Sequence, residues 1–276
     1  MSEPVRRIPP YLEDLVVRSE SRRETSAYDA PAPPARPVPE IKDPKSLAFL
    51  ERLMKSTPAK VVTGRTGTRY RTDTYLSLRG DHAIAKDAVT ADLPGELAGE
   101  LDCILVTTRC PDRAHYLLHP NDGRRLSDES RRRLEQEGAH DVDVQVILAD
   151  GLAAPALQIN GPRLLPALLR ELRSRNLAAG RPILASMARV GLQDDIGVLL
   201  NARATLICLG ERPGLGTGDS LSIYLAVAPK LDQDNAEKNC ISNIRPQGMS
   251  PEAAAEAAAV LVARGLELGR SGLDLV

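Results

Sequence analysis

The sequence predicts an α/β protein, with a Rossmann-like, mostly parallel sheet domain preceded by a small, mainly helical domain and a disordered Pro-rich N-terminal tail. Three observations lead to this prediction. Apolar runs alternate with helical patterns from residue 139 onward, which is typical of βαβ units. Residues 45–138 have mainly helical patterns, with a polar and basic stretch over residues 59–90. Residues 1–44 hold nine of the 21 prolines, too many for a segment that buries a core.

The tail, residues 1–44, is expected to stay outside the folded domains. Within it, residues 11–18 have the spacing of a short amphipathic helix that could dock on a partner. A solvated tail with chance periodicity explains the same pattern, and both interpretations stay open.

The domain of residues 45–138 is expected to begin with a helix capped by Asp43, with Pro44 at its first position and Pro58 beyond its end. Further helices are predicted over about 81–89 and 124–138. The apolar run at 103–107 indicates one strand.

The domain of residues 139–276 alternates strands with helices. Strands are predicted over residues 142–148, 183–187, 204–209 and 221–228. Helices are predicted to start at Pro162, at about Gln193, and at Ser250-Pro251, the last ending near Gly269. This order favours a parallel sheet with right-handed crossovers.

Two loops of this domain indicate a binding site for a large ligand. Residues 210–220 follow a buried strand and begin with four glycines in nine residues, which would let backbone approach a ligand closely. Glu211 and Arg212 sit at the carboxyl end of that strand, where open α/β sheets bind ligands. Residues 239–248 add a second patch that is dense in amide and hydroxyl groups.

The glycine loop does not fit a nucleotide motif. A P-loop needs Gly-Lys-Ser/Thr, but Gly218 is followed by Asp219, which would repel phosphate. Gly214 and Gly216 fit the first two positions of a dinucleotide fingerprint, but Asp219 occupies the third. A strand rather than a helix follows, so no helix N-terminus meets a pyrophosphate.

Composition excludes several classes of function. A net charge of -1 and 3 % aromatic residues, with no Trp, speak against a nucleic-acid partner. No apolar run approaches the ~20 residues that span a bilayer, so we expect no membrane segment. The four cysteines form no CxxC pair, which fits reduced thiols in the cytoplasm.

Five segments, in order, resemble signature segments of the light chain (small subunit) of ethanolamine ammonia-lyase. They are Gly64–Arg69, Asp81–Asp87, Asp143–Leu152, Gly210–Gly216 and Asn239–Ile244. The resemblance spans about residues 45–265 and leaves out the tail. Gly218-Asp219 departs from it, since the family more often has Ser-Glu there, although the acidic character is kept.

The resemblance implies a subunit of an enzyme that depends on adenosylcobalamin (coenzyme B12) and converts ethanolamine to acetaldehyde and ammonia by radical chemistry. The partner would be a heavy chain that carries the substrate site, in a hetero-oligomer of heavy and light chains. This chain would complete the cobalamin site and supply no catalytic acid, base or nucleophile. Its location would be the cytoplasm, with a bacterial microcompartment as the other possibility.

Carried over by residue, the family's cobalamin contacts fall at Val190, Glu211 and Cys240. Val190 would offer a backbone amide, Glu211 a carboxylate that accepts from corrin amides, and Cys240 its backbone or sulfur. Each of these three residues could also have a purely structural role. Val190 would be ordinary strand core, Glu211 would pair with Arg212, and Cys240 would be a small packed residue.

Two other groups of residues are weaker candidates for a functional site. Cys103, Cys110, His115 and His119 could be a zinc set, but the six-residue gap between the cysteines is wider than structural zinc sites use. Asp194-Asp195 could be a catalytic pair, yet acids at the start of a helix stabilise its dipole.

The basic segment Arg65–Lys86 fits an interface with the heavy chain or with the cofactor's nucleotide tail. Two functions of other classes remain as alternatives, a self-contained nucleotide-dependent α/β enzyme and a cofactor-free scaffold subunit.

Overall fold

The computed structural model describes residues 44–57, 59–61 and 63–275. They fall into two compact units, one of residues 44–87 with 214–217, and a larger one of residues 88–213 with 218–275. The tail, the amphipathic stretch at 11–18 and the predicted cap Asp43 lie outside the described residues. No helix among those described is long and apolar enough to cross a membrane.

The smaller unit is built on two helices. They are α2 (Pro44–Ser56) and α3 (Thr72–Thr90), whose last residues enter the larger unit, with the short strands β1 (Arg65–Thr66) and β2 (Arg69–Tyr70) between them. Helix α2 confirms the predicted start at proline and ends before Pro58. Helix α3 is longer than the predicted 81–89. The prediction missed its first turns because they carry exposed Tyr75 and Leu76 and lack the apolar periodicity that indicates a helix.

The larger unit contains a six-stranded sheet. Its strands, in spatial order, are β3 (Ile104–Thr107), β5 (Ile183–Ser186), β4 (Val144–Ala149), β6 (Ala204–Gly210), β7 (Leu221–Val227) and β8 (Asn239–Ile244). The first four are parallel, and β7 and β8 run antiparallel to their neighbours, so the mostly parallel α/β sheet is confirmed. The strand order is not the 3-2-1-4-5-6 of dinucleotide-binding folds.

Strand β3 belongs to the larger unit, contrary to the predicted domain boundary. The sequence places residues 103–107 in a separate domain ending at residue 138. In the structure β3 pairs with β5, and the units divide between Asp87 and Ala88 instead. A four-residue edge strand carries too little pattern to reveal which sheet it joins.

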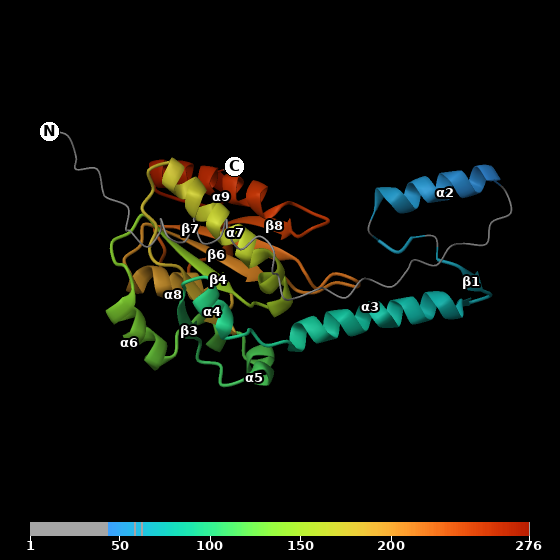
Figure 1. Cartoon of the computed structure of the whole chain (residues 1–276), viewed down its shortest axis with the longest axis horizontal. Coiled ribbons are helices and arrows are strands. Elements are labelled where there is room, and N and C mark those ends of the chain that lie inside the picture. Colours follow the sequence, from blue (N-terminus) through green and yellow to red (C-terminus); the bar gives the residue numbers. More distant parts are fainter. Residues whose placement is uncertain (1–43, 58, 62, 276) are drawn as a thin grey trace. The chain divides into compact units, whose positions relative to one another are not determined.

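Helices cover both faces of the sheet (Figure 1). Helices α7 (Ala154–Ser174) and α9 (Pro251–Leu268) pack on one face, and α6 (Asp128–Glu137) and α8 (Leu192–Leu199) on the other. The shorter elements are α4 (Glu96–Glu100), α5 (Arg113–Leu118), η1 (Asp122–Arg124), η2 (Asn235–Glu237) and η3 (Leu273–Leu275).

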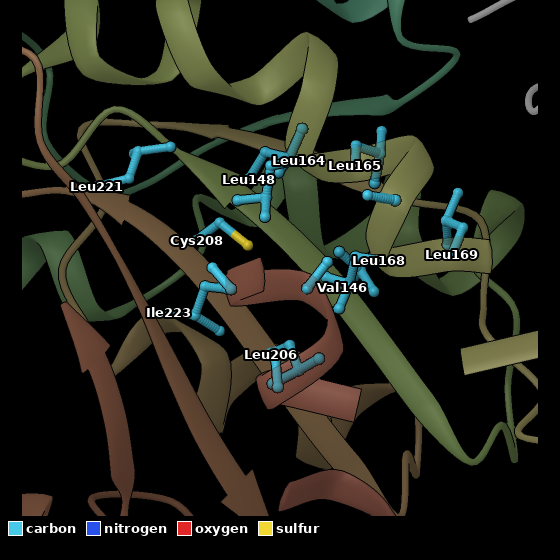
Figure 2. Packing of buried hydrophobic residues seen from close by; sticks show 14 of the residues in the cluster. Val146, Leu148, Leu164, Leu165, Leu168, Leu169, Leu206, Cys208, Leu221 and Ile223 are labelled. Carbon is cyan, nitrogen blue, oxygen red and sulfur yellow. The ribbon is translucent and has the colours of Figure 1, made fainter. Parts of the chain in front are cut away.

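Each face of the sheet has its own core. Along β4, Val146 and Leu148 point toward α7 and α9, where Figure 2 shows them packed with leucines of α7. Ile147 and Ala149 point to the α6 and α8 side. This alternation follows from the two-residue period of a strand, and the run is apolar throughout because both faces are covered.

Helix α7 begins at Ala154, eight residues before the predicted Pro162. Pro155 occupies its first turn, where a missing N–H costs nothing, while Pro162 and Pro166 lie inside the helix. The fully buried leucine stripe of this helix offsets the backbone hydrogen bonds that these prolines remove.

The prediction of the last helix is confirmed, and the prediction of the last strand is wrong. Helix α9 is confirmed, since Ser250 caps it by accepting from Ala253 N at 3.2 Å and Gly269 ends it at φ +70°. The prediction that 221–228 is the final strand is wrong, because the amide patch itself forms the edge strand β8. Its Asn and Ser residues are typical of loops, and pairing with β7 outweighs that preference.

Candidate functional site

The carboxyl ends of the parallel strands define one edge of the sheet. The other two strands reach this edge as well, because Gly210 at the end of β6 lies opposite Leu221, which lies opposite Ile244 at the end of β8. Residues that follow β4, β5, β6 and β8 therefore come together where ligands bind in open α/β sheets.

The glycines of the loop after β6 serve the fold. A Cβ on Gly210 would lie 2.3 Å from the carbonyl oxygens of both Asp150 and Ala153, so only glycine lets β6 approach the chain after β4 this closely. In the smaller unit, Gly216 turns at φ +73° against Asp81 of α3. We expected these glycines to admit a ligand; instead the chain's own backbone and side chains occupy the space beside them.

Glu211 follows Gly210 and is half-buried. Its carboxylate Oε1 accepts a hydrogen bond from Ser222 Oγ at 2.6 Å and another from Asn243 N at 2.8 Å. Both hydrogen bonds that the carboxylate accepts from the described residues reach Oε1, so Oε2 is left for another donor. Arg212, the alternative partner, is exposed and is not among those donors.

A β-bulge turns Asn243 toward this carboxylate. Between the pairs Leu221–Ile244 and Ile223–Ile241, β8 contains one more residue than β7. Asn243 takes up the extra length at φ +60°, a conformation that asparagine tolerates better than most residues. Its N–H therefore leaves the ladder and points to Glu211.

A second contact fixes the turn after β8. Arg245 Nη2 forms an ion pair with Asp219 Oδ1 at 3.0 Å, and Asn160 of α7 donates to the Asp219 carbonyl at 2.8 Å. Asp219 is one of the two residues, Gly218 and Asp219, at which our sequence analysis expected a departure from the resembling family. Its acidic character therefore has a structural use, since it ties the β6–β7 loop to the end of β8.

Cys240 lies beside Glu211 on the exposed side of the β7–β8 pair. It is opposite Tyr224 and its side chain is exposed. Desolvation of the sulfur raises the pKa of the thiol, the Glu211 charge raises it further, and the hydroxyls of Tyr224 and Ser222 oppose that rise. Burial, followed by the effect of Cys240, raises the pKa of Tyr224 to about 12. At neutral pH this surface therefore presents an S–H group and a phenol, with Glu211 beside them.

Val190 lies in the connection between β5 and α8 and is half-buried against the core on the α6 and α8 side, as is Tyr224. Two nearby N–H groups are used, Arg189 N by Gly123 O at 2.8 Å and Leu192 N by Arg189 O at 2.9 Å, whereas Gly191 N has no acceptor among the described residues. Val190 N has no acceptor among the described residues. The group that the resemblance assigned to a ligand is therefore unpaired.

Asp150 holds this connection in place. Its carboxylate accepts from Met187 N at 2.9 Å and Ala188 N at 3.1 Å, and it pairs with Arg113 Nη1 at 2.8 Å. Met187 sits at φ +55°, which is strained for a residue other than glycine, so these bonds support an unusual backbone path leading to Val190.

The structure thus brings Glu211 and Cys240 together and places Val190 on the same face, separated from them in strand order by β4. Our sequence analysis missed Ser222, Tyr224 and Asp150 as parts of the site. Alternation along residues 221–227 could have placed the first two on one face. Asp150 belongs to a resembling segment, but no local pattern indicates that a carboxylate reaches the backbone of another loop.

The structure offers no ligand cluster for the zinc alternative and explains the two aspartates of the catalytic-pair alternative. Among the described residues no three His, Cys, Asp or Glu side chains converge as metal ligands. Asp194 is in the first turn of α8 and forms a buried ion pair with Lys238 at 2.9 Å. Asp195 accepts from Leu126 N at 2.8 Å and Arg131 Nη2 at 2.6 Å. Both acids connect α8 to neighbouring segments.

The basic segment lies in the smaller unit. Arg65 stacks over Tyr70 at 4.6 Å and Arg79 over Tyr75 at 5.7 Å from the ring centres, and both arginines remain exposed. These contacts make a cationic and aromatic surface within that unit.

Two comparisons with known proteins agree with the resemblance seen in the motifs. The family model described as ethanolamine ammonia-lyase light chain (EutC) matches residues 48–276. The ethanolamine ammonia-lyase small subunit of Fusobacterium nucleatum subsp. nucleatum is 36% identical over 240 residues, which cover 87% of this chain and 81% of that protein. Both matches extend over most of the chain, and the match to the family model includes every site residue described above. The chain therefore belongs to the ethanolamine ammonia-lyase light chain family.

Proposed function

We propose that this chain completes an adenosylcobalamin site at an interface with a heavy chain, in a complex that deaminates ethanolamine to acetaldehyde and ammonia. The observation that carries the proposal is the Glu211 carboxylate, which the described residues hold by Oε1 and leave free at Oε2 on a polar surface. Family membership supports the reaction, since the curated relative is named as a subunit of this lyase.

The residues present fit a corrin ring. Corrin is wide, rigid and edged with amides, so its recognition needs several separate donors and acceptors and no strong cluster of charge. The surface offers a carboxylate oxygen at Glu211 and an N–H at Val190 that have no partner in the described part of the chain, and a thiol at Cys240. Leaving a polar group unpaired in a closed interface costs about 1–3 kcal/mol, so each of these groups gains by meeting an amide.

When bound, adenosylcobalamin supplies the radical chemistry through homolysis of its cobalt–carbon bond. This chain's part is to bind and orient. Glu211 would accept from amide N–H groups of the corrin, Val190 N would donate to an amide oxygen, and Cys240 would contact the cofactor through its backbone or its protonated thiol. We assign no acid, base or nucleophile to these residues, and place the substrate site in the heavy chain.

The experiment is a titration of adenosylcobalamin, followed by absorbance, into heavy chain alone, heavy chain with this chain, and heavy chain with the Glu211→Ala variant. We expect tight binding only when both chains are present. Glu211→Ala should raise the Kd of adenosylcobalamin by about 5- to 150-fold, because a charge-assisted hydrogen bond contributes roughly 1–3 kcal/mol to binding. Acetaldehyde release from ethanolamine should follow the same order.

Glu256→Ala is the matched control, because it removes an exposed carboxylate from α9 on the opposite face of the sheet. Unchanged affinity for Glu211→Ala in the assembled complex would remove Glu211 from the site. If heavy chain alone bound the cofactor as well as the complex does, this chain would be a cofactor-free scaffold. We place the complex in the cytoplasm; deleting residues 1–44 and locating the protein tests whether that segment directs it to a bacterial microcompartment.

A further inference from the structure

We propose that Ser222 is a positioning residue for cofactor binding, which acts by holding Glu211 through one carboxylate oxygen so that the other meets the ligand. This inference rests on the proposed function and adds to it a residue that neither the motifs nor the family resemblance assigns.

The geometry around Oε1 carries the inference. Ser222 is only 3% exposed, and its hydroxyl donates to Glu211 Oε1 at 2.6 Å. Asn243 N donates to the same oxygen at 2.8 Å. A carboxylate can accept about four hydrogen bonds, two on each oxygen. Two donors on Oε1 therefore fix the direction of the carboxylate and leave Oε2 available.

The two donors belong to different strands, which makes the arrangement specific. Ser222 comes from β7, and Asn243 reaches Glu211 only because of the bulge in β8. The backbone donor is present whatever residue occupies position 222. The serine hydroxyl is the only side-chain donor to Glu211 among the described residues, so this contact can be removed by substitution.

Removing the hydroxyl should weaken cofactor binding without abolishing it. A glutamate side chain that is already ordered loses little entropy when a ligand binds, whereas a mobile one must be ordered first. With Asn243 N still in place, we expect Ser222→Ala to raise the Kd of adenosylcobalamin about 3- to 10-fold.

Ser220→Ala is the matched control. Ser220 lies two residues before Ser222, is 8% exposed, and its hydroxyl has no hydrogen-bond partner among the described residues. The control therefore removes a buried serine hydroxyl just before β7 and keeps the backbone hydrogen bond from Glu211 N to Ser220 O at 2.9 Å. Its Kd should stay within about twofold of the unmodified complex, within the error of such titrations.

A double-mutant cycle separates positioning from a merely structural role. Kd is measured for the complex carrying Ser222→Ala, Glu211→Ala, and both, alongside the melting temperature of each free chain. If Ser222 acts through Glu211, most of the effect of Ser222→Ala should disappear once Glu211 is alanine, and any remainder reflects the contact of the Ser222 hydroxyl with Cys240. An equal weakening in both backgrounds would overturn the inference, as would an unchanged Kd for Ser222→Ala alone.

The proposed function fails differently, since it falls if Glu211→Ala leaves Kd unchanged. If Ser222→Ala lowers the melting temperature of the free chain, Ser222→Cys replaces it in the cycle. A thiol is somewhat larger than the hydroxyl and is a weak donor, so Kd should rise while the fold is kept; the titration contains a reductant because Cys240 lies beside position 222. A Kd equal to that of the serine chain would again overturn the inference.

Discussion

Two carboxylates at the same edge of the sheet are used in opposite ways. Asp150 follows β4 and Glu211 follows β6, and these strands pair so that Ala149 lies opposite Leu209. Asp150 is 2% exposed, and both its oxygens are engaged, Oδ2 by Arg113 and Met187 N, Oδ1 by Ala188 N. Glu211 is half-buried and uses a single oxygen.

The difference shows how a carboxylate that holds the fold can be distinguished from one available to a ligand. A buried charge must be paired and hydrogen-bonded, because an unpaired one costs several kcal/mol. Asp150 meets that demand within the chain, although burial still raises its pKa against the effect of Arg113. Glu211 is only partly satisfied by the chain, and its second oxygen needs solvent or a partner.

The largest expected effect is the loss of stability in Asp150→Ala. Removing one member of a buried ion pair leaves Arg113 uncompensated and frees two buried backbone N–H groups, which should cost about 3–5 kcal/mol of unfolding free energy. Glu211→Ala should cost less, about 1–2 kcal/mol, because water can reach the exposed Asn243 N–H and only the buried Ser222 hydroxyl loses its acceptor. Urea unfolding of the free chain measures both.

Asp150→Asn sharpens this test, since it keeps an acceptor oxygen for the backbone while removing the charge that faces Arg113. Its loss of stability should lie between those of Asp150→Ala and Glu211→Ala. If Asp150→Ala and Glu211→Ala destabilised the free chain equally, the contrast between the two carboxylates would have no energetic basis.

The buried thiol of Cys208 and the exposed thiol of Cys240 show the same contrast, with smaller expected effects on stability. Cys208 of β6 is buried between the sheet and helices α7 and α9 (Figure 2), and burial raises its pKa from 9.0 to about 12. Below pH 9 the thiol is protonated in both the folded and unfolded states. Between pH 9 and 12 only the unfolded chain ionises at Cys208, so stability falls as pH rises, by about 1.4 kcal/mol per pH unit.

The check is the unfolding free energy at pH 8, 9.5 and 10.5 for the natural chain and for Cys208→Ala. The variant is expected to lose stability less steeply with pH, by about 1.4 kcal/mol per unit, even if it is less stable at pH 8. It retains Cys103, whose pKa burial also raises to about 12, so some slope should remain. Identical slopes would contradict the burial of Cys208.

The sheet was readable from the sequence because its signals are local. Strands β4 and β6 are continuous apolar runs, and the cap at Ser250 and the stop at Gly269 are defined by single residues. Strand β8 was not readable, because Asn239–Ile244 has the composition of a loop and becomes a strand only by pairing with β7. Long-range pairing is a property of two segments, and neither reveals it alone.

The site divides in the same way. Position at the end of a strand was enough to select Glu211, and the resemblance added Val190 and Cys240. Which oxygen of Glu211 is free depends on Ser222 and on a bulge at Asn243, both distant in sequence. The same holds for Asp150, whose backbone partners are 37 and 38 residues away.

The smallest expected effect on stability is at Cys240, the exposed counterpart of Cys208. Cys103, Cys110 and Cys208 are buried, so one thiol of the four should react rapidly with a chromogenic disulfide in the native chain, and all four after unfolding. Because the pKa of Cys240 is raised, its reaction rate should still increase as pH passes 9. Cys240→Ser should abolish the fast phase and change the unfolding free energy by less than about 0.5 kcal/mol.

A fast phase that persists in this variant would show that another thiol is accessible. Protection of Cys240 by heavy chain and adenosylcobalamin together, but not by either alone, would show that this open face is closed by the ligand and its partner jointly.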